Sequence, residues 1–193
     1  EHPYFHDHPS WFNAGCICGT DGCDWTEHRL DCLFRPYLPD INWTNPEASE
    51  QIIDDALGWM ERFDLDGFRV DAVKHVNDAA IFNLGTRARE RFETAGTEVF
   101  LMGETAMGWD SSSGPQAGGN IENYGTISHY IGPSGLTGQF DFVLYYAAAL
   151  QFLTDTPGRG MAHIDYWSQE SQREYPAGAI MTPYIGSHDT ARF

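Results

Sequence analysis

Residues 65–76 read LDGFRVDAVKHV, a short run in which a guanidinium and a carboxylate lie two positions apart. On a β-strand, Arg69 and Asp71 share one face, while Phe68 and Val70 point to the other. Two interpretations are open from these residues alone. Either Asp71 is a reactive acid displayed where a strand gives way to a loop, or it forms a structural ion pair with Arg69 that ties the strand to its neighbour.

Two further apolar runs also lead to acidic residues. Residues 99–105 read VFLMGET and carry Glu104, and residues 179–189 read AIMTPYIGSHD and end in Asp189. With Asp71, these runs place three carboxylates at one end of one sheet. Acids are costly to gather unless chemistry or a metal needs them. The three runs together therefore predict a functional site.

The motifs occur in the order found in the α-amylase family, glycoside hydrolase family 13, which the chain resembles. Residues 67–75 resemble the family's strand-four motif, residues 103–105 its strand-five motif, and residues 187–189 its strand-seven motif. Residues 8–12 and 38–42 are similar to parts of the domain inserted after strand three. The resemblance implies an α/β fold: a partial (β/α)8 TIM barrel, about strands 4 to 7, with an irregular inserted domain after strand 3.

The resemblance implies a catalytic role for each acid. Asp71 is expected to be the nucleophile, Glu104 the general acid/base and Asp189 the transition-state stabiliser. Cleavage with retention requires one ionised and one protonated carboxyl group, about 5 Å apart, and their surroundings must give them different proton affinities. Arg69 favours the ionised form of Asp71, and the apolar residues 100–102 favour burial and a raised pKa for Glu104.

Four residues are implied to bind substrate. Arg69 is expected to orient Asp71, and His188 to bind hydroxyl groups of the sugar in the reacting subsite. Lys74 and His75 resemble the pair that contacts sugar on the leaving-group side in true α-amylases. We therefore expect an α-glucan or malto-oligosaccharide as the substrate.

The resemblance also implies a structural calcium ion (Ca2+) between the inserted domain and the barrel. Calcium prefers oxygen ligands from carboxylates and backbone carbonyls. The expected ligands in this chain are Asp31 and the carbonyl oxygen of His75. A further ligand expected from upstream sequence has no counterpart here, and Asp31 can equally be interpreted as an exposed loop acid.

The chain departs from the family in two respects. Ser187 stands where the family usually has Asn, which predicts a modest change in local hydrogen bonding, and the strand-three motif has no match. A complete barrel needs about 250 residues, whereas this chain has 193. We therefore expect an internal fragment, with residues 1–45 in the inserted domain and residues 46–193 in the partial barrel. Flanking sequence is expected to supply the rest of the barrel, without which the segment should be inactive.

The remaining pattern alternates between strands and helices, which favours a parallel α/β sheet. Residues 44–47 carry a capping polar side chain and a proline, which predicts the start of a helix that continues to about residue 63. Residues 108–138 are rich in Gly, Ser and Asn, which predicts a long loop over a binding face. The other expected elements are helices at residues 78–93, 143–153 and 161–173 and a short strand at residues 139–142. No segment is long enough to cross a membrane.

Charge and cysteine content limit the partners and the compartment. The net charge is −17, from 28 acidic and 11 basic residues, and this disfavours nucleic acid, whose phosphates require a basic face. Four cysteines lie in the irregular first segment: Cys16, Cys18, Cys23 and Cys32. They predict two disulfides in a secreted protein, extracellular or periplasmic, with free thiols and a zinc site as the alternatives.

Three functions remain open. The first is a retaining glycoside hydrolase that cleaves α-1,4-glucosidic bonds in starch-like glucans, which Lys74 and His75 favour. The second is an α-glucosidase or transglycosylase that acts on short malto-oligosaccharides, because residues 38–42 are intermediate between the amylase and oligosaccharide-type patterns. The third is a non-catalytic transporter subunit or binding module. Such relatives tend to lose the acids, and all three acids persist here.

Overall fold

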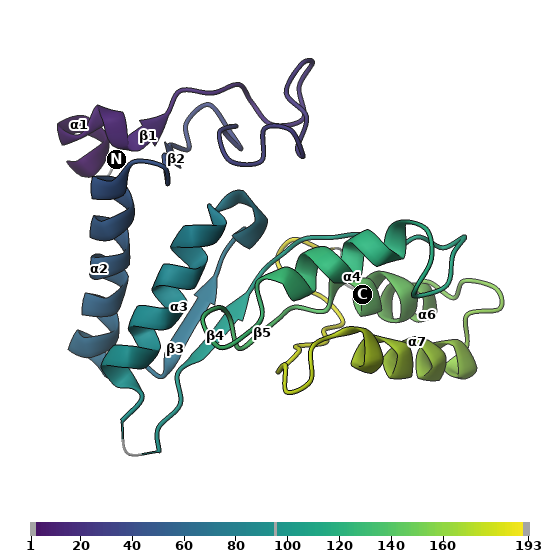
Figure 1. The fold of residues 1–193 in the computed structure, drawn as a ribbon. Coiled ribbons are helices and arrows are strands. Elements are labelled where there is room, and N and C mark those ends of the chain that lie inside the picture. The colour runs from purple at the N-terminus through teal and green to yellow at the C-terminus, as the bar shows by residue number, and fades with distance from the viewer. Residues whose placement is uncertain (1–2, 95, 191–193) are drawn as a thin grey trace.

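The computed structural model describes residues 3–94 and 96–190 (Figure 1). Its parallel sheet consists of β3 (Gly67–Val70), β4 (Phe100–Gly103) and β5 (Gly138–Gln139), with helices α2 (Pro46–Phe63) and α3 (Asp78–Phe92) beside it. The other elements are α1 (Pro3–Asp7), α4 (Gly119–His129), α5 (Phe142–Leu144), α6 (Leu150–Leu153), α7 (Met161–Glu174), the 3-10 turns η1 (Pro9–Trp11) and η2 (Val73–His75), the π-helical η3 (Tyr145–Ala149), and the antiparallel pair β1 (Phe12–Asn13) and β2 (Asp40–Ile41). Within the described residues, no helix has the length and apolar character that crossing a bilayer would require.

The strands of the parallel sheet are neighbours in sequence order. β3 pairs with β4, and β4 pairs with β5. Residues 180–182 extend the sheet beyond β5, because Thr182 forms a parallel bridge with Phe140 and donates its backbone N–H to the carbonyl of Gln139 at 2.8 Å. Four parallel strand positions therefore lie side by side, and the predicted parallel α/β arrangement is confirmed.

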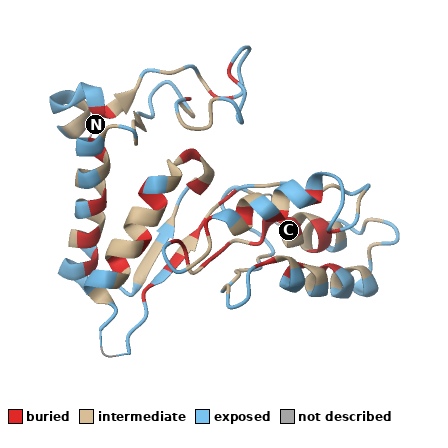
Figure 2. Cartoon of the chain, in the orientation of Figure 1, coloured by how far each residue is buried: buried red, intermediate tan, exposed pale blue. Residues whose placement is uncertain are grey.

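Helices α2 and α3 share one hydrophobic core with the sheet. The side chain of Asn45 caps α2 by accepting hydrogen bonds from two backbone N–H groups of its first turn, as the sequence predicts. The buried face of α2 carries Ile53, Leu57 and Met60, which lie in one core cluster with Leu101 of β4. Figure 2 shows buried residues recurring along both helices. The amphipathic pattern thus fixes α2 against the sheet.

A second core lies among α4, α5, η3 and α7, and Figure 1 shows α4 and α7 grouped together on one side of the molecule. Tyr124 and Ile127 of α4 are buried there with Trp167 of α7. The predicted long loop over residues 108–138 is therefore wrong in part, because α4 occupies its middle. The glycines and asparagines of α4 have weak helix propensity, and burial of its apolar side chains outweighs that weakness. The predicted helix at residues 143–153 likewise contains the π-helical η3.

Residues before α2 form an irregular excursion that two disulfides close. Cys16 bonds to Cys23 and Cys18 bonds to Cys32. The two predicted disulfides are therefore present, and Cys18, Cys23 and Cys32 form the small buried core of this segment. The two disulfides stabilise this loop, which has little regular secondary structure.

Close packing of β3 on β4 generates a stability prediction. A Cβ atom added to Gly67 would lie 1.7 Å from the carbonyl oxygen of Phe100, whereas one added to Gly58 in α2 would meet nothing within 4 Å. We expect Gly67→Ala to lower the free energy of unfolding by about 1–3 kcal/mol, since the strands must move apart. Gly58→Ala should raise it by roughly 0.5–1 kcal/mol. Urea unfolding of both variants of the full-length protein, followed by circular dichroism, measures this; equal midpoints would contradict it.

Candidate active site

Asp71 and Glu104 lie next to each other at the carboxyl edge of the sheet. Asp71 follows β3 directly and Glu104 follows β4 directly. Since Val70 is the register partner of Gly103, the two acids occupy matching positions on adjacent parallel strands. The backbone pairing continues past the strands: the N–H of Glu104 donates to the carbonyl of Val70 at 2.9 Å. The register of the sheet thus sets the spacing of the two carboxyl groups.

Arg69 contacts both acids through its two terminal nitrogens. One Nη atom lies 2.5 Å from Asp71 Oδ1, and the other lies 3.1 Å from Glu104 Oε2. The side chain of Asp71 is 72% exposed, whereas that of Glu104 is 14% exposed. A planar guanidinium suits such two-point contact with carboxylates. The site therefore combines one open acid, one enclosed acid and one shared cation.

These surroundings move the pKa values of the two carboxyl groups in opposite directions. Burial raises the pKa of Glu104, and its hydrogen bond with Asp71 raises it further. The same hydrogen bond lowers the pKa of Asp71, and the positive charge of Arg69 lowers it again. These directions favour a proton on Glu104, which can donate it in a hydrogen bond to an ionised Asp71. One acid is prepared to give a proton while the other carries negative charge.

The chain turns sharply directly after Asp71. Ala72 has φ of 45°, in the left-handed region that costs an alanine roughly 1–2 kcal/mol. This turn directs the N–H of Ala72 toward Glu104 Oε2 at 3.4 Å. Backbone strain of this kind gathers at functional sites, and here the strained residue lies one position beyond the exposed acid, just after the end of β3.

Lys74 and His75 lie in η2, the short helical turn that begins two residues after Asp71. Lys74 Nζ donates to the carbonyl of Ala106 at 2.7 Å, in the loop that follows Glu104. The ring of His75 donates from Nδ1 to the carbonyl of Arg29 at 2.9 Å. Burial lowers the pKa of both Lys74 and His75. His75 is therefore a buried packing group, with its ring directed at the disulfide loop.

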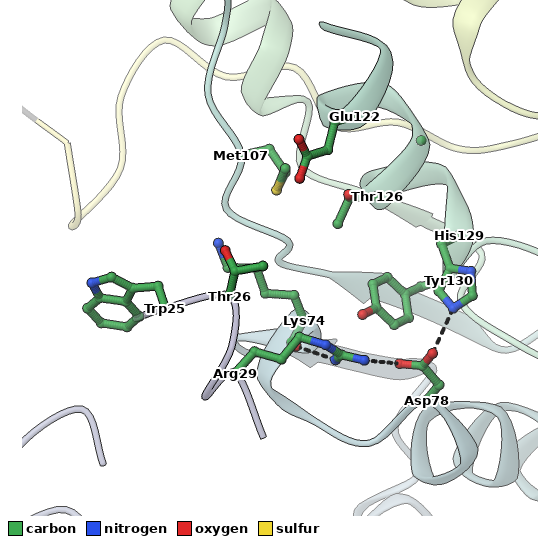
Figure 3. Close-up of a pocket in the computed structure, with 11 residues that line it drawn as sticks. Trp25, Thr26, Arg29, Lys74, Asp78, Met107, Glu122, Thr126, His129 and Tyr130 are labelled. Atoms are coloured by element: carbon green, nitrogen blue, oxygen red, sulfur yellow. Dashed lines mark hydrogen bonds and ion pairs between the residues drawn. The ribbon is translucent and has the colours of Figure 1, made fainter. Parts of the chain in front are cut away.

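Lys74 also lines a pocket of about 440 Å³ (Figure 3). Residues of the disulfide loop, η2 and α4 meet there. Arg29 donates to the carbonyl of Lys74 at 2.8 Å and lies 3.4 Å from Asp78, which also contacts His129 at 2.9 Å. Sequence reasoning missed Arg29, because a single arginine in an irregular segment gives neither a period nor a motif.

His188 and Asp189 follow the fourth strand position and contact each other. His188 Nε2 lies 3.0 Å from Asp189 Oδ2, and the two side chains are 75% and 58% exposed. The hydroxyl of Ser187 accepts a hydrogen bond from the N–H of Asp189 at 3.1 Å. Among residues 3–94 and 96–190, no hydrogen bond or ion pair joins this pair to Asp71 or Glu104. The structure thus brings together two of the three expected acids by direct contacts.

The region expected to bind calcium contains several oxygen donors. Asp31 contacts the ring of His28 at 3.1 Å and is 58% exposed. Asp40 lines, together with His75, a cavity of about 190 Å³. Burial raises the pKa of Asp40, and the charge of Asp31 adds to this. In the described part of the chain, no three His, Cys, Asp or Glu side chains are grouped to hold a metal. Carboxylate and carbonyl oxygens nevertheless fit the donor chemistry of calcium.

The sequence of this chain is similar to those of known carbohydrate-active enzymes. The family model "Alpha amylase, catalytic domain" matches residues 19–193. Maltase A2 of Drosophila melanogaster is 28% identical over 198 residues, which cover 87% of this chain and 34% of the maltase. The intracellular maltogenic amylase of Bacillus subtilis (strain 168) is 31% identical over 94 residues, covering 49% of this chain and 14% of that protein.

A solved structure extends the likeness to the fold. The α-amylase of Geobacillus thermoleovorans, complexed with acarbose, superimposes with a TM-score of 0.74 at 23% identity, covering 100% of this chain and 38% of that one. A parallel β/α sheet with paired carboxyl groups at its carboxyl edge is of the kind that glycoside hydrolases use. The chain belongs to the α-amylase family and carries part of its catalytic domain. It spans about a third of the length of Maltase A2.

Removing the shared cation tests the electrostatics of the pair. The charge of Arg69 lowers the pKa of both Asp71 and Glu104. We therefore expect Arg69→Met to raise both pKa values, so that each group ionises only at higher pH. Carboxyl-carbon NMR titration of the full-length protein measures this, with Arg91→Met as the control, because Arg91 pairs with the distant Glu61. Unchanged titration of Asp71 in Arg69→Met would contradict the assignment.

Proposed function

We propose that the full-length protein is a retaining glycoside hydrolase that cleaves α-1,4-glucosidic bonds in starch-like glucans. The observation that carries this proposal is the shared contact of Arg69 with Asp71 and Glu104, whose pKa values move in opposite directions. Retaining cleavage needs such a pair, one ionised and one protonated. Family membership independently supports the glycosidase class.

In this proposal the two acids divide the work by exposure and charge. Asp71 is ionised and exposed, so it attacks the anomeric carbon and forms a covalent glycosyl ester. Glu104 is enclosed and protonated, so it gives its proton to the departing glycosidic oxygen. It then takes a proton from the water that hydrolyses the ester. Asp189 stabilises the oxocarbenium-like charge of the transition state, and His188 binds the hydroxyl groups of the same sugar.

Lys74 and His75 contribute to the leaving-group side in the same proposal. Lys74 lines the 440 Å³ pocket of Figure 3, beside the loop that follows Glu104. This supports a site for sugar beyond the cleaved bond. His75 is buried, so its contribution is to hold the wall of that pocket in place.

The fold is proposed to be a segment of a (β/α)8 barrel. The four parallel strand positions correspond to strands four to seven, and sequence outside residues 1–193 supplies the other strands. Residues 1–45 belong to the inserted domain. The two disulfides support a secreted protein, because such bonds persist in oxidising compartments.

A structural calcium ion is proposed where this inserted domain meets the barrel. Asp31, Asp40 and the carbonyl of His75 would hold it, and the ion would supply positive charge between the two parts of the chain. Asp40 is partly buried, which raises its pKa, and it lines a cavity together with His75; both observations support this position. Asp40 adds to the two ligands expected from the sequence.

The alternative is an α-glucosidase or transglycosylase that acts on short malto-oligosaccharides. The observation in its favour is the set of relatives, which includes a maltase and a maltogenic amylase. The covalent intermediate can pass to water or to sugar, so the same residues serve either outcome.

A single substitution tests the central acid. We expect Glu104→Gln in the full-length protein to lower kcat on starch by about 10²- to 10⁴-fold, because the amide cannot donate the proton. Glu98→Gln is the matched control. Glu98 is exposed and lies just before β4, at the opposite end of the strand from Glu104. Reducing-sugar release measures both variants. Undiminished hydrolysis by Glu104→Gln would refute the assignment.

Product analysis separates the two candidate activities. For the amylase proposal, we expect large oligomers to appear early from starch, because cleavage occurs within the chain. Chromatography of products from starch and maltotriose measures this in the full-length enzyme. Glucose as the sole early product would favour the glucosidase alternative, and products longer than maltotriose would favour transfer.

A further inference from the structure

Phe140 lies beneath the cation that joins the two acids. It directly follows β5, and its backbone N–H donates to the carbonyl of Gly103 at 3.1 Å. Its parallel bridge with Thr182 fixes it on the other side. The guanidinium carbon of Arg69 lies over the Phe140 ring, 5.9 Å from its centre. The Phe140 ring, which follows β5, therefore supports the Arg69 guanidinium, which contacts the acids that follow β3 and β4.

Other aromatic rings hold Phe140 in place. The ring of Tyr184 meets Phe140 edge-on at 5.5 Å, with an interplanar angle of 75°. Tyr184 in turn stacks on Tyr145 at 4.6 Å, with an angle of 7°. Edge-to-face and stacked pairs of this kind are favourable beyond their buried area. The Phe140 ring thus has neighbours that resist its movement.

We propose that Phe140 is a positioning residue for Arg69, holding the guanidinium where one nitrogen meets Asp71 and the other meets Glu104. The effect of this positioning on catalysis rests on the function proposed above. The reason is geometric. A flexible arginine can satisfy either acid alone, but contact with both requires one orientation of the guanidinium plane. A ring beneath the cation favours that position by cation–π attraction and shields it from water.

The charged and titratable groups that face the two carboxyl groups come from several elements. Arg69 contributes from β3. Tyr184 contributes from the segment after residues 180–182, where burial raises the pKa of its hydroxyl and the neighbouring Glu104 carboxyl group raises it further. Lys74 lies in η2, with its Nζ bonded to the loop after Glu104. Asp71 and Glu104 complete the set. Of these groups, Phe140 contacts Arg69 and, edge-on, the ring of Tyr184.

Three variants of the full-length protein test the proposal kinetically. Phe140→Leu should lower kcat by about 3- to 30-fold with little change in KM, and both limbs of its pH–kcat profile should move to higher pH, since Arg69 lowers the pKa of both acids. Phe140→Tyr keeps an aromatic ring at this position, so its kcat, KM and pH–kcat profile should stay close to those of the wild type. Phe68→Leu is the control, because Phe68 neighbours Arg69 in β3 but packs in the core on the other side. It should lower the melting temperature while the pH–kcat profile stays unchanged.

Crystal structures of the wild type and Phe140→Leu supply a readout that does not depend on activity. We expect the distance from Arg69 to Asp71 or Glu104 to lengthen in the variant. If the wild type does not cleave α-glucans, the proposed function fails, and this comparison still decides the role of Phe140. The proposal would be overturned if Arg69 did not move in the Phe140→Leu structure. It would also be overturned if Phe140→Leu lowered the melting temperature as Phe68→Leu does but left both limbs of the pH–kcat profile unshifted, because Phe140 would then contribute packing alone.

Discussion

Two carboxyl groups meet at one guanidinium, and this contact organises the candidate site. Asp71 and Glu104 would repel each other if both were ionised. Arg69 contacts both, but its single charge cannot compensate two anions. These contacts therefore favour a state in which one of the two groups is protonated. Burial assigns that proton to Glu104, whose side chain is 14% exposed, and leaves the charge on the open Asp71.

Backbone geometry rather than side-chain flexibility creates this meeting. The register of β3 against β4 places the two acids at matching positions, and the pairing continues to Glu104 itself. The left-handed Ala72 then ends the strand and directs its N–H toward Glu104. Gly67, at the start of β3, permits the close approach of the two strands. The sheet core and the site therefore depend on the same backbone contacts.

Local sequence signals predict one part of this arrangement and long-range packing decides the other. The cap at Asn45 and the apolar spacing predict α2, since both act within a few residues. The helix α4 is not predictable in this way, because its glycine-rich sequence folds only against the second core. The same holds for Arg29 and Phe140, whose contacts join residues far apart in the chain. The predicted convergence of Asp189 with the other two acids stays a prediction.

The coupling of the two acids also bears on how the proposed reaction can complete its second half. While Asp71 is ionised, its hydrogen bond and its charge both raise the pKa of Glu104. Once Asp71 is esterified, it carries no charge and accepts that proton poorly, so both effects fade. The positive charge of Arg69 remains and lowers the pKa of Glu104. The pKa of Glu104 is then lower than before the ester forms, which favours the ionised form that is needed to take a proton from water. The arrangement that prepares an acid for the first step therefore prepares a base for the second.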